Sequence, residues 1–390
     1  MVGPMAFQVF DPKNQRSLES CMSYRAAMVG QHPGDERALY EAVGVGVDVS
    51  SFADINAWTA VSSGLIERKI LEQFDNPIFI GSELMPDEYT KIAEGQKIIG
   101  AARIGNLAEE RQPGETHKRA GFGERYVTLG KTRELGLALD LNKEAVFFDL
   151  TGQVLQTASK VGEWIAFQDE YNKLDAFIGV TTQSGGKWQF VYKGTGTNTY
   201  QITNANGFGY TNQVSNQLVD WTNLQASWLL FARMLDPETG TRIGVMPDTI
   251  VVNPAQLATA RLIIDSPDVE RRSAGLTGTQ ANASVLQISH GGKNPAGDFG
   301  VKRLLWSPLL EERCTDALGL NLTQPQANAY WWHLQAGKTF KNMVNWPLNI
   351  AQAPPNSYDM LDRGIIASYF ANLRSMPSVW SPWHVVLNTI

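Results

Sequence analysis

The amino-acid sequence predicts an α+β fold, and three observations carry this prediction. Residues 149–178 have the apolar spacing of one long helix. Residues 248–264 have the pattern of a buried strand, a turn and a helix, and residues 301–390 contain mostly strand-like segments. With 390 residues, of which 43% are hydrophobic and 18% are charged, the chain is expected to form two or three compact units.

The N-terminal region begins with residues 1–50, which are weakly periodic and which we interpret as an arm. Residues 51–74 have helical spacing, with Ser51 as the N-cap. Residues 78–85 are predicted to be extended up to Pro86, because proline breaks such a segment.

The following segment predicts an extended hairpin that reaches away from the body of the protein. Residues 96–104 have the pattern of a strand, whereas residues 105–124 are polar and contain four glycines and one proline. A segment of this composition cannot form a core of its own. A second and longer strand follows it, through residue 141.

One face of this second strand combines apolar and basic residues. Successive strand residues point to opposite sides. One side is apolar at both ends, with Val127 and Leu129, then Leu135, Leu137, Leu139 and Leu141. Lys131 and Arg133 lie between them on the same side. A domain core would not accept two basic residues there, so this face is expected to meet something else.

The long helix is predicted over residues 149–178, with Asp149 or Thr151 as its N-terminal cap. Its apolar stripe, beside Trp164, consists of Val154, Ala158, Val161 and Ile165. Gly179 is well placed to end the helix. Such a helix would be roughly 40 Å long, which exceeds the usual length of about 12 residues in globular proteins.

The remaining elements are mixed. Residues 181–214 are rich in Gly, Thr, Asn and Gln and have the pattern of short strands and turns, residues 216–235 predict a second amphipathic helix, and residues 266–300 are rich in loops. Further extended segments are predicted at residues 301–310, 329–335 and 340–351, with an apolar, aromatic segment at 362–373 and an extended tail at 378–390.

Charge and cysteine content limit the possible functions. The net charge is −6 and no block of Lys and Arg is present, so a direct grip on nucleic-acid phosphates is not indicated. Cys21 and Cys314 form no CxxC motif and are expected to be reduced thiols. Neither a signal peptide nor a membrane span is expected. The 11 tryptophans favour large buried surfaces, including subunit interfaces.

No catalytic, cofactor-binding or metal-binding residue is predicted. Gly130–Thr132 and Gly337–Thr339 both read GKT, but the glycine that a phosphate loop needs five residues earlier is replaced by Arg125 and Trp332. The histidines are widely separated, and neither HExxH nor GxSxG occurs. The adjacent pair Glu311–Glu312 is expected to be solvated.

Two tryptophan-rich stretches, residues 329–333 and 380–383, leave two interpretations open. Both stretches are compatible with a platform that stacks against sugars, and both are compatible with core or interface packing. Packing is favoured, because no accompanying set of polar side chains indicates a carbohydrate site.

The order of these elements resembles the major capsid proteins of tailed bacteriophages, which have the Hong Kong 97-like fold. Residues 126–171, YVTLGKTRELGLALDLNKEAVFFDLTGQVLQTASKVGEWIAFQDEY, resemble that family's extended loop returning into its spine helix. Residues 246–264, MPDTIVVNPAQLATARLII, are similar to the strand, turn and helix of its axial domain. Residues 378–388, SVWSPWHVVLN, are similar to its closing strand. The resemblance covers residues 52–390, and the head proteins of Mu-like phages are the nearest group.

The resemblance implies an organisation into domains. It gives an N-terminal arm at 1–50, a first part of the peripheral domain at 51–95, an extended loop at 96–141, a spine helix at 142–180, an axial domain with a Gly/Thr/Asn-rich elaboration at 181–300, and a return through both domains to a C-terminal strand at 301–390. The N-terminus has no long charged helical segment, which implies a separate scaffolding protein or none.

The resemblance also implies a structural function rather than an enzymatic one. Copies of the chain would assemble as pentamers and hexamers into an icosahedral head that encloses double-stranded DNA without sequence-specific binding. No cofactor and no membrane would be involved, and scaffolding, portal and decoration proteins are the expected partners. The protein would be located in the virion, after assembly in the cytoplasm of the bacterial host.

The functional surface implied by the resemblance is the contact between subunits. Candidate contact residues in the extended loop are Lys118, Arg119, Arg125, Lys131, Arg133 and Glu134. Lys131 and Arg133 would reach acidic groups on another chain, while Leu135–Leu141 would pack near the subunit's own spine helix. Some family members join a loop lysine covalently to an asparagine of a neighbour, and Lys118 is the candidate for that role. The alternative is a solvated two-stranded arm on a monomer.

Two other functions remain open from the sequence. An encapsulin-type nanocompartment shell resembles the same fold but encloses a cargo enzyme, and the neighbouring genes would distinguish it from a phage head. A carbohydrate-binding β-rich protein would use the tryptophan clusters, so changes at Trp331 or Trp383 would abolish ligand binding.

Overall fold

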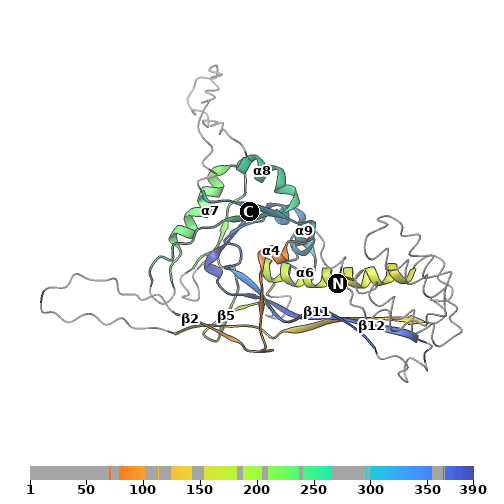
Figure 1. Cartoon of the computed structure of the whole chain (residues 1–390). Coiled ribbons are helices and arrows are strands. Elements are labelled where there is room, and N and C mark those ends of the chain that lie inside the picture. Colours follow the sequence, from red (N-terminus) through yellow and green to blue (C-terminus); the bar gives the residue numbers. More distant parts are fainter. Residues whose placement is uncertain are drawn as a thin grey trace, which may run out of the picture. The chain divides into compact units, whose positions relative to one another are not determined.

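The computed structural model describes residues 70–71, 79–101, 113, 124–142, 153–181, 188–203, 210–236, 240–265, 296, 299–353, 363 and 365–390 (Figure 1). The chain divides into two compact units, which are described separately. Unit 1 comprises residues 1–77, 133–170 and 345–375, and unit 2 comprises residues 78–132, 171–344 and 376–390. Both units contain helix and strand, which confirms the α+β prediction.

Several predicted segments lie outside the described residues. They are the arm at 1–50, most of the helix at 51–74, most of the polar segment at 105–124, the start of the long helix, and residues 266–295. The domain boundaries implied by the resemblance therefore stay a prediction. Within the described ranges, no helix is both long enough and apolar enough to cross a membrane.

Unit 1 is built on strands β11 (Phe340–Gln352), β12 (Ile365–Val379) and β4 (Arg133–Asn142), with β4 at the edge of the sheet. β4 and β12 pair in antiparallel fashion, so that Leu135 lies opposite Leu373 and Leu139 lies opposite Tyr369. This register places the odd-numbered residues of both strands on one face and the even-numbered residues on the other.

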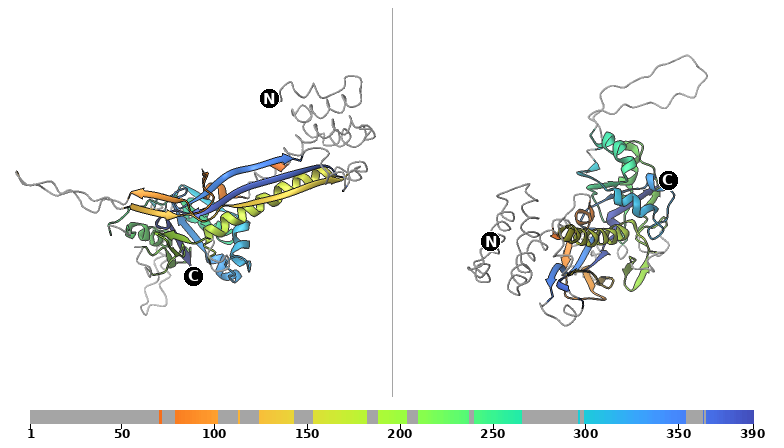
Figure 2. Two further views of the ribbon diagram at one scale, coloured as in Figure 1. Left: turned by 90° about the horizontal axis from the view of Figure 1, so that it is seen from below. Right: turned by 90° about the vertical axis from the view of Figure 1, so that its right-hand side faces the viewer.

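The odd-numbered face of this sheet packs against α6 (Gln153–Ile178). Its buried side chains are Leu139, Leu141, Tyr369, Ala371 and Leu373. Ser375 Oγ donates a 3.1 Å hydrogen bond to Asp169 Oδ1 of α6, and α6 runs alongside β4 and β12 in Figure 2. The alternation predicted from the sequence is therefore observed, although Leu137 near the middle of β4 is 42% exposed.

Helix α6 confirms the long helix predicted from the sequence. Its 26 residues correspond to about 39 Å. It ends at Gly179, whose φ of +80° is a left-handed conformation that glycine adopts without strain. The N–H groups of Gly179 and Val180 donate to the Asp175 carbonyl at 3.1 and 3.0 Å. The predicted caps, Asp149 and Thr151, lie outside the described residues.

The strand predicted to continue through residue 141 is in fact two strands in different sheets. β3 (Glu124–Thr128) pairs with β2 (Lys97–Ala101), whereas β4 pairs with β12. Residues 129–132 connect β3 to β4, and the N–H groups of the first and last of them donate to the carbonyls of Gln96 and Ala93. Because the two strands have different partners, the chain must leave one ladder before it enters the next. The first GKT sequence therefore lies in a connection and not within a strand.

Antiparallel pairing of β2 with β3 confirms the base of the predicted hairpin, from Lys97 opposite Thr128 to Ala101 opposite Glu124. β3 also pairs with β5 (Phe190–Tyr192), and β5 pairs with β6 (Thr195–Thr197). The hairpin is thus anchored in a four-stranded sheet of unit 2 with the order β2-β3-β5-β6.

A second sheet of unit 2 has five strands in the order β7-β13-β10-β8-β9. Their bounds are Gln213–Ser215, Val385–Thr389, Trp331–Leu334, Thr249–Val252 and Arg303–Trp306. The central strand, β10, pairs in antiparallel fashion with β8 and with β13. Helices α7 (Trp221–Arg233) and α8 (Leu257–Asp265) lie in this unit near the C-terminus (Figure 1). Residues of α7, α8, β8 and β10 share one core cluster.

The predicted strand, turn and helix at residues 248–264 are confirmed as β8, the 3-10 turn η2 (Pro254–Gln256) and α8. Asn253 at the turn is buried, and its Nδ2 donates to the carbonyl of Ala327 in α10 (Gln324–Ala329). The second predicted helix begins at a capping box, in which Asn223 Oδ1 accepts from the backbone N–H of Asp220 at 3.0 Å. The Asp220 carboxylate also accepts from the N–H of Thr222 at 2.8 Å.

Two extended segments predicted from the sequence are wrong in part. Residues 78–85 include the single turn α4 (Gly81–Leu84), which places Ile80 and Leu84 on one buried side, four residues apart. Residues 301–310 contain β9 but then enter α9 (Pro308–Thr315), because Ser307 caps the helix and proline suits its first position. The short elements β1 (Asp87–Tyr89) and η4 (Pro382–His384) complete the described fold.

Candidate inter-subunit surfaces

The described residues offer no constellation of catalytic side chains. In these ranges, no group of His, Cys, Asp and Glu side chains is placed to hold a metal ion. Burial raises the pKa of the Cys314 thiol to about 12, so it is not a ready nucleophile. The second GKT sequence, residues 337–339, lies in the turn before β11 and not at the start of a helix.

Three tryptophans of the two clusters belong to the core, which confirms the packing interpretation for them. Trp331, Trp332 and Trp383 are all 0% exposed. Trp383 packs edge-on against Phe190 at 5.6 Å and Tyr210 at 5.4 Å between ring centroids. Rings in this position cannot stack against a sugar without unfolding the protein. The partly exposed Trp380 ring instead contacts the Lys341 ammonium group at 3.8 Å.

Lys131, in the connection between β3 and β4, has an acidic partner in its own chain. Its Nζ lies 3.4 Å from Glu94 Oε2, and the two side chains are 63% and 68% exposed. An ion pair this exposed contributes only ~0–1 kcal/mol. Both charges therefore stay accessible to a second molecule.

Of the other predicted contact residues, three lie on described strands and two lie outside the described residues. Arg133 and Glu134 begin β4 and are exposed, and Glu134 Oε1 lies 3.5 Å from Asn372 Nδ2 of β12. Arg125 is located on β3. Lys118 and Arg119 lie outside the described residues. A contact with another chain stays a prediction for all six.

The base of the hairpin is held firmly within unit 2. The backbone N–H of Leu129 donates to Gln96 at 2.9 Å, and both the N–H and the hydroxyl of Thr132 donate to the Ala93 carbonyl, at 2.8 and 3.2 Å. Thr90 Oγ1 donates to Gln96 Oε1 at 2.6 Å. These bonds fix the direction in which β2 and β3 leave the connection.

Strand β1, which precedes the hairpin, is also held in place by specific contacts. β1 pairs with β11 in parallel, and Lys341 Nζ of β11 lies 2.7 Å from Glu88 Oε2. The same ammonium group lies 3.8 Å from the centre of the Trp380 ring, a distance typical of a cation–π contact. Asn342 Nδ2 donates to Asp87 Oδ1 at 2.8 Å.

The strongest candidate for a binding surface is the even-numbered face of the sheet in unit 1, which we call the outer face. It includes Glu134, Gly136, Ala138 and Asp140 on β4 and Phe370, Asn372 and Arg374 on β12. The contact between Arg374 and the Trp346 ring places Trp346 of β11 on the same face. Phe370 is 44% exposed and Trp346 is 37% exposed. Exposed aromatic rings in such a setting mark surfaces that bind other proteins.

The outer face has a charged rim around its apolar residues. The guanidinium of Arg374 lies over the Trp346 ring at 5.2 Å. The Asp140 carboxylate accepts a 2.6 Å hydrogen bond from Ser368 Oγ. Gly136 leaves room on β4, since a Cβ there would meet only ordinary contacts at 3.8 Å. The face thus combines aromatic anchors, small residues and charges of both signs.

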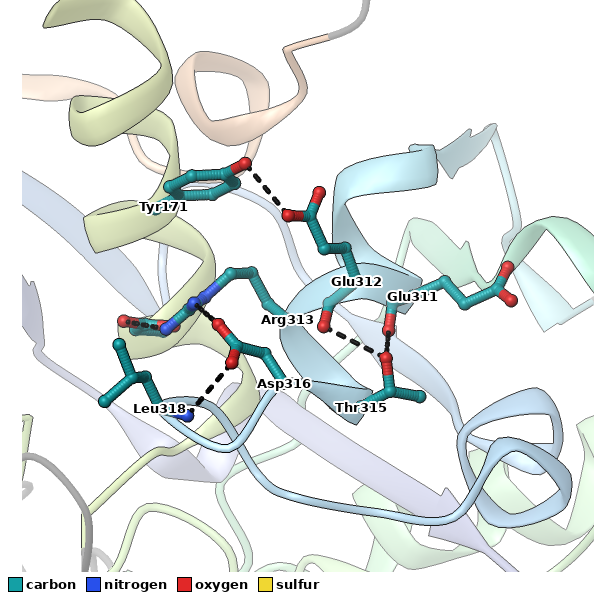
Figure 3. A network of polar contacts seen from close by, with 8 residues as sticks. Tyr171, Glu311, Glu312, Arg313, Thr315, Asp316 and Leu318 are labelled. Atoms are coloured by element: carbon teal, nitrogen blue, oxygen red, sulfur yellow. Dashed lines mark hydrogen bonds and ion pairs between the residues drawn. The ribbon is translucent and has the colours of Figure 1, made fainter. Parts of the chain in front are cut away.

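A partly buried polar network within unit 2 joins α6 to α9 (Figure 3). The Arg313 guanidinium binds Asp175 through Nε at 2.8 Å and Nη2 at 3.0 Å, and it reaches Asp316 through Nη1 at 2.5 Å. Burial alone would lower the pKa of Arg313, but its hydrogen bonds and attraction to Asp175 raise it overall. The Tyr171 hydroxyl donates to Glu312 at 3.1 Å, and the pKa of Tyr171 is raised by its burial and then by the Glu312 charge.

Sequence reasoning missed both the outer face and this network. The alternation of Trp346, Leu348 and Ile350 along β11 could have indicated an apolar face. No signal in the sequence pairs Arg313 with Asp175, which is 138 residues away. Glu312, expected to be solvated, is exposed but also accepts the Tyr171 hydrogen bond.

Comparison with known protein families gives a match that covers most of the chain. A family model described as phage capsid protein matches residues 125–364, more than half of the sequence. No curated protein sequence matches the chain.

Similar solved structures include capsids and one particle. The capsid asymmetric unit of cyanophage Pam1 is 10% identical, with 82% of this chain and 91% of that chain covered, at a TM-score of 0.47. The capsid of cyanophage P-SCSP1u is 11% identical, with 80% and 88% covered, at 0.46. A virus-like particle from Pyrococcus furiosus is 8% identical, with 83% and 98% covered, at 0.40.

Proposed function

Because this chain belongs to the phage capsid protein family, we propose that it is the major capsid protein of a tailed phage. Copies assemble as pentamers and hexamers into an icosahedral head that encloses double-stranded DNA. The role is structural, and the working surface is the contact between copies. Scaffolding, portal and decoration proteins are the expected partners, and assembly takes place in the cytoplasm of the bacterial host.

The observation that carries this proposal is the family match across residues 125–364. The matched range contains all but the first residue of β3, all of α6, and strands β4 and β11 of the outer face, whereas β12 begins directly after it. The absence of a metal-binding group among the described side chains is compatible with a structural role but does not argue for it.

Two features of the molecule support contact with other copies. The hairpin of β2 and β3 is anchored at its base in unit 2, and the polar sequence beyond it has too few apolar residues to form a core. The outer face presents Trp346 and Phe370 to solvent. In a closed shell, symmetry repeats each contact many times, so individually weak contacts become collectively strong.

The first test is assembly. The full chain is expressed alone and together with its neighbouring genes, and the products are examined by velocity sedimentation and negative-stain electron microscopy. Closed uniform shells, or rings of five and six copies, are the expected result. A chain that stays monomeric or dimeric under both conditions, over a wide range of concentration and salt, would exclude the capsid role.

The content of the shells separates a phage head from an encapsulin-type nanocompartment. Shells from cells that carry the complete set of neighbouring genes are treated with nuclease and then analysed for DNA and for co-purifying protein. Protected double-stranded DNA is expected. Shells that instead enclose one enzyme in constant proportion would favour the nanocompartment.

A further inference from the structure

His333 occupies the centre of the five-stranded sheet in unit 2. It lies on β10, the middle strand, opposite Ile250 of β8 on one side and Val386 of β13 on the other. Its side chain is 0% exposed. The Phe231 ring of α7 packs edge-on against the imidazole, with 5.3 Å between ring centroids.

The described surroundings of the imidazole give it no polar partner. Neither Nδ1 nor Nε2 forms a hydrogen bond within the described part of the chain. A neutral imidazole still carries one N–H donor, so the site already bears the cost of an unsatisfied group. A second N–H and a positive charge would add a much larger cost, since an unpaired charge is very unfavourable in an apolar interior.

Among the described elements that pack against His333, no charge offsets this cost. Strands β8 and β13 contain no titratable side chain, and Arg233 is the only one on α7. The nearest groups along the strands are Asp248, immediately before β8, and His384, immediately before β13. Burial alone lowers the pKa of His333 to about 3, so these groups do not determine its protonation.

We propose that His333 makes the five-stranded sheet sensitive to acid. The closed sheet accommodates only the neutral imidazole, and protonation of His333 favours a locally open state of the sheet. The sign follows from linkage. When the sheet opens, the imidazole regains an ordinary pKa of about 6.5. Below that pH it binds a proton in the open sheet that it does not bind in the closed sheet. The closed state is therefore fully favoured above pH 6.5. It becomes less favoured as the pH falls from 6.5 towards 3.

The experiment measures local opening of β10 by backbone hydrogen exchange and peptide mass spectrometry between pH 7.5 and 4.5. Rates are corrected for the intrinsic effect of pH on exchange. The full-length protein is compared with His333→Leu and His333→Phe, and His384→Gln is the matched control on a partly exposed histidine. Below pH 6, the opening constant of residues 331–334 is expected to rise as the pH falls, and to rise more in the wild type than in either His333 variant. The extra rise in the wild type should be about tenfold for each pH unit. The His384→Gln protein should follow the wild type.

A second measurement needs no variant at position 333. Deuterium exchange at the imidazole Cε1 of the native wild type, read by peptide mass spectrometry, reports the titration of each histidine. His333 is expected to stay neutral throughout the range to pH 4.5. A His333 that titrates near 6.5 in the native protein, or equal pH dependence of opening in the wild type and the His333→Leu protein, would overturn the proposal.

Discussion

The Arg374 guanidinium lies 5.2 Å from the centre of the Trp346 ring, on the outer face of the sheet in unit 1. A contact of this kind contributes about 0.5–1 kcal/mol at an exposed site. Its larger effect is to restrict the ring, which is 37% exposed. An aromatic side chain that is already held in place loses less conformational entropy when a partner covers it. Trp346 is therefore suited to be an anchor of an interface.

The first prediction concerns this anchor. The double change Trp346→Ala and Phe370→Ala is expected to lower the yield of closed shells at least tenfold, because it removes both exposed rings of the outer face. The thermal midpoint of the unassembled protein should change little, since neither ring is buried. Sedimentation measures the shells, and circular dichroism measures the midpoint.

Trp164 provides the matched control for the outer face. It is 67% exposed in unit 1, but it lies on α6 and not on the sheet. Trp164→Ala should assemble like the wild type. If it blocks assembly as strongly as the double change, the effect is not specific to the outer face.

The second prediction separates two roles of Lys131. Its pair with Glu94 is largely exposed, so Lys131→Glu should change the free energy of unfolding by only ~0–1 kcal/mol. If Lys131 meets an acidic group on another chain, the same change should reduce assembly strongly. The combined swap Lys131→Glu with Glu94→Lys restores the internal pair but not that contact. Full recovery of assembly by the swap would show that only the internal pair matters.

The third prediction concerns Arg313, whose side chain is 9% exposed and binds Asp175, which is 14% exposed. Arg313→Met removes the cation that pairs with a nearly buried carboxylate, and the expected loss is about 3–5 kcal/mol of the free energy of unfolding. The free energy of unfolding of Arg313→Lys should fall between those of the wild type and Arg313→Met, because an ammonium group cannot reproduce the bidentate contact. Urea unfolding followed by tryptophan fluorescence measures the change. The exposed Arg303 offers a control, and a loss as small as that of Arg303→Met would contradict the prediction.

The fourth prediction is a pH dependence at Cys314. Burial raises its pKa from 9.0 to about 12, so at pH 8 the native thiol is protonated and shielded. Iodoacetamide should leave the Cys314 peptide unlabelled in the native protein and label it in denaturant, as read by mass spectrometry. The stabilising effect of the neutral thiol is fully present below pH 9 and is lost as the pH rises towards 12. Alkaline destabilisation should therefore be weaker in Cys314→Ala than in the wild type.

Local signals in the sequence were sufficient for the elements that depend on near neighbours. The apolar spacing of α6 and the glycine at position 179 predicted a long helix and its end. The β-forming run before Asn253 and Pro254 predicted β8 and α8. Within such segments, the interactions that decide the conformation lie within a few residues, so a pattern read along the chain can find them.

Pairing between distant segments was not accessible in this way. The alternation from Val127 to Leu141 has a single period, yet the chain divides there because β3 pairs with β2 and β4 pairs with β12. Nothing in the sequence distinguished Trp346 from the other tryptophans. Its contact with Arg374 on an exposed face of the sheet is visible only in the folded chain.

Residue patterns along the chain were enough to predict the class of the fold, the long helix and the base of the hairpin, and they contain no recognisable catalytic motif. The folded structure was needed to see which residues of a strand are covered and that Arg313 pairs with Asp175. It was also needed to see that His333 lies between two strands with no polar partner among the described residues. Burial and pairing depend on contacts between segments far apart in the chain, whereas helix and strand periodicity is a property of each segment alone.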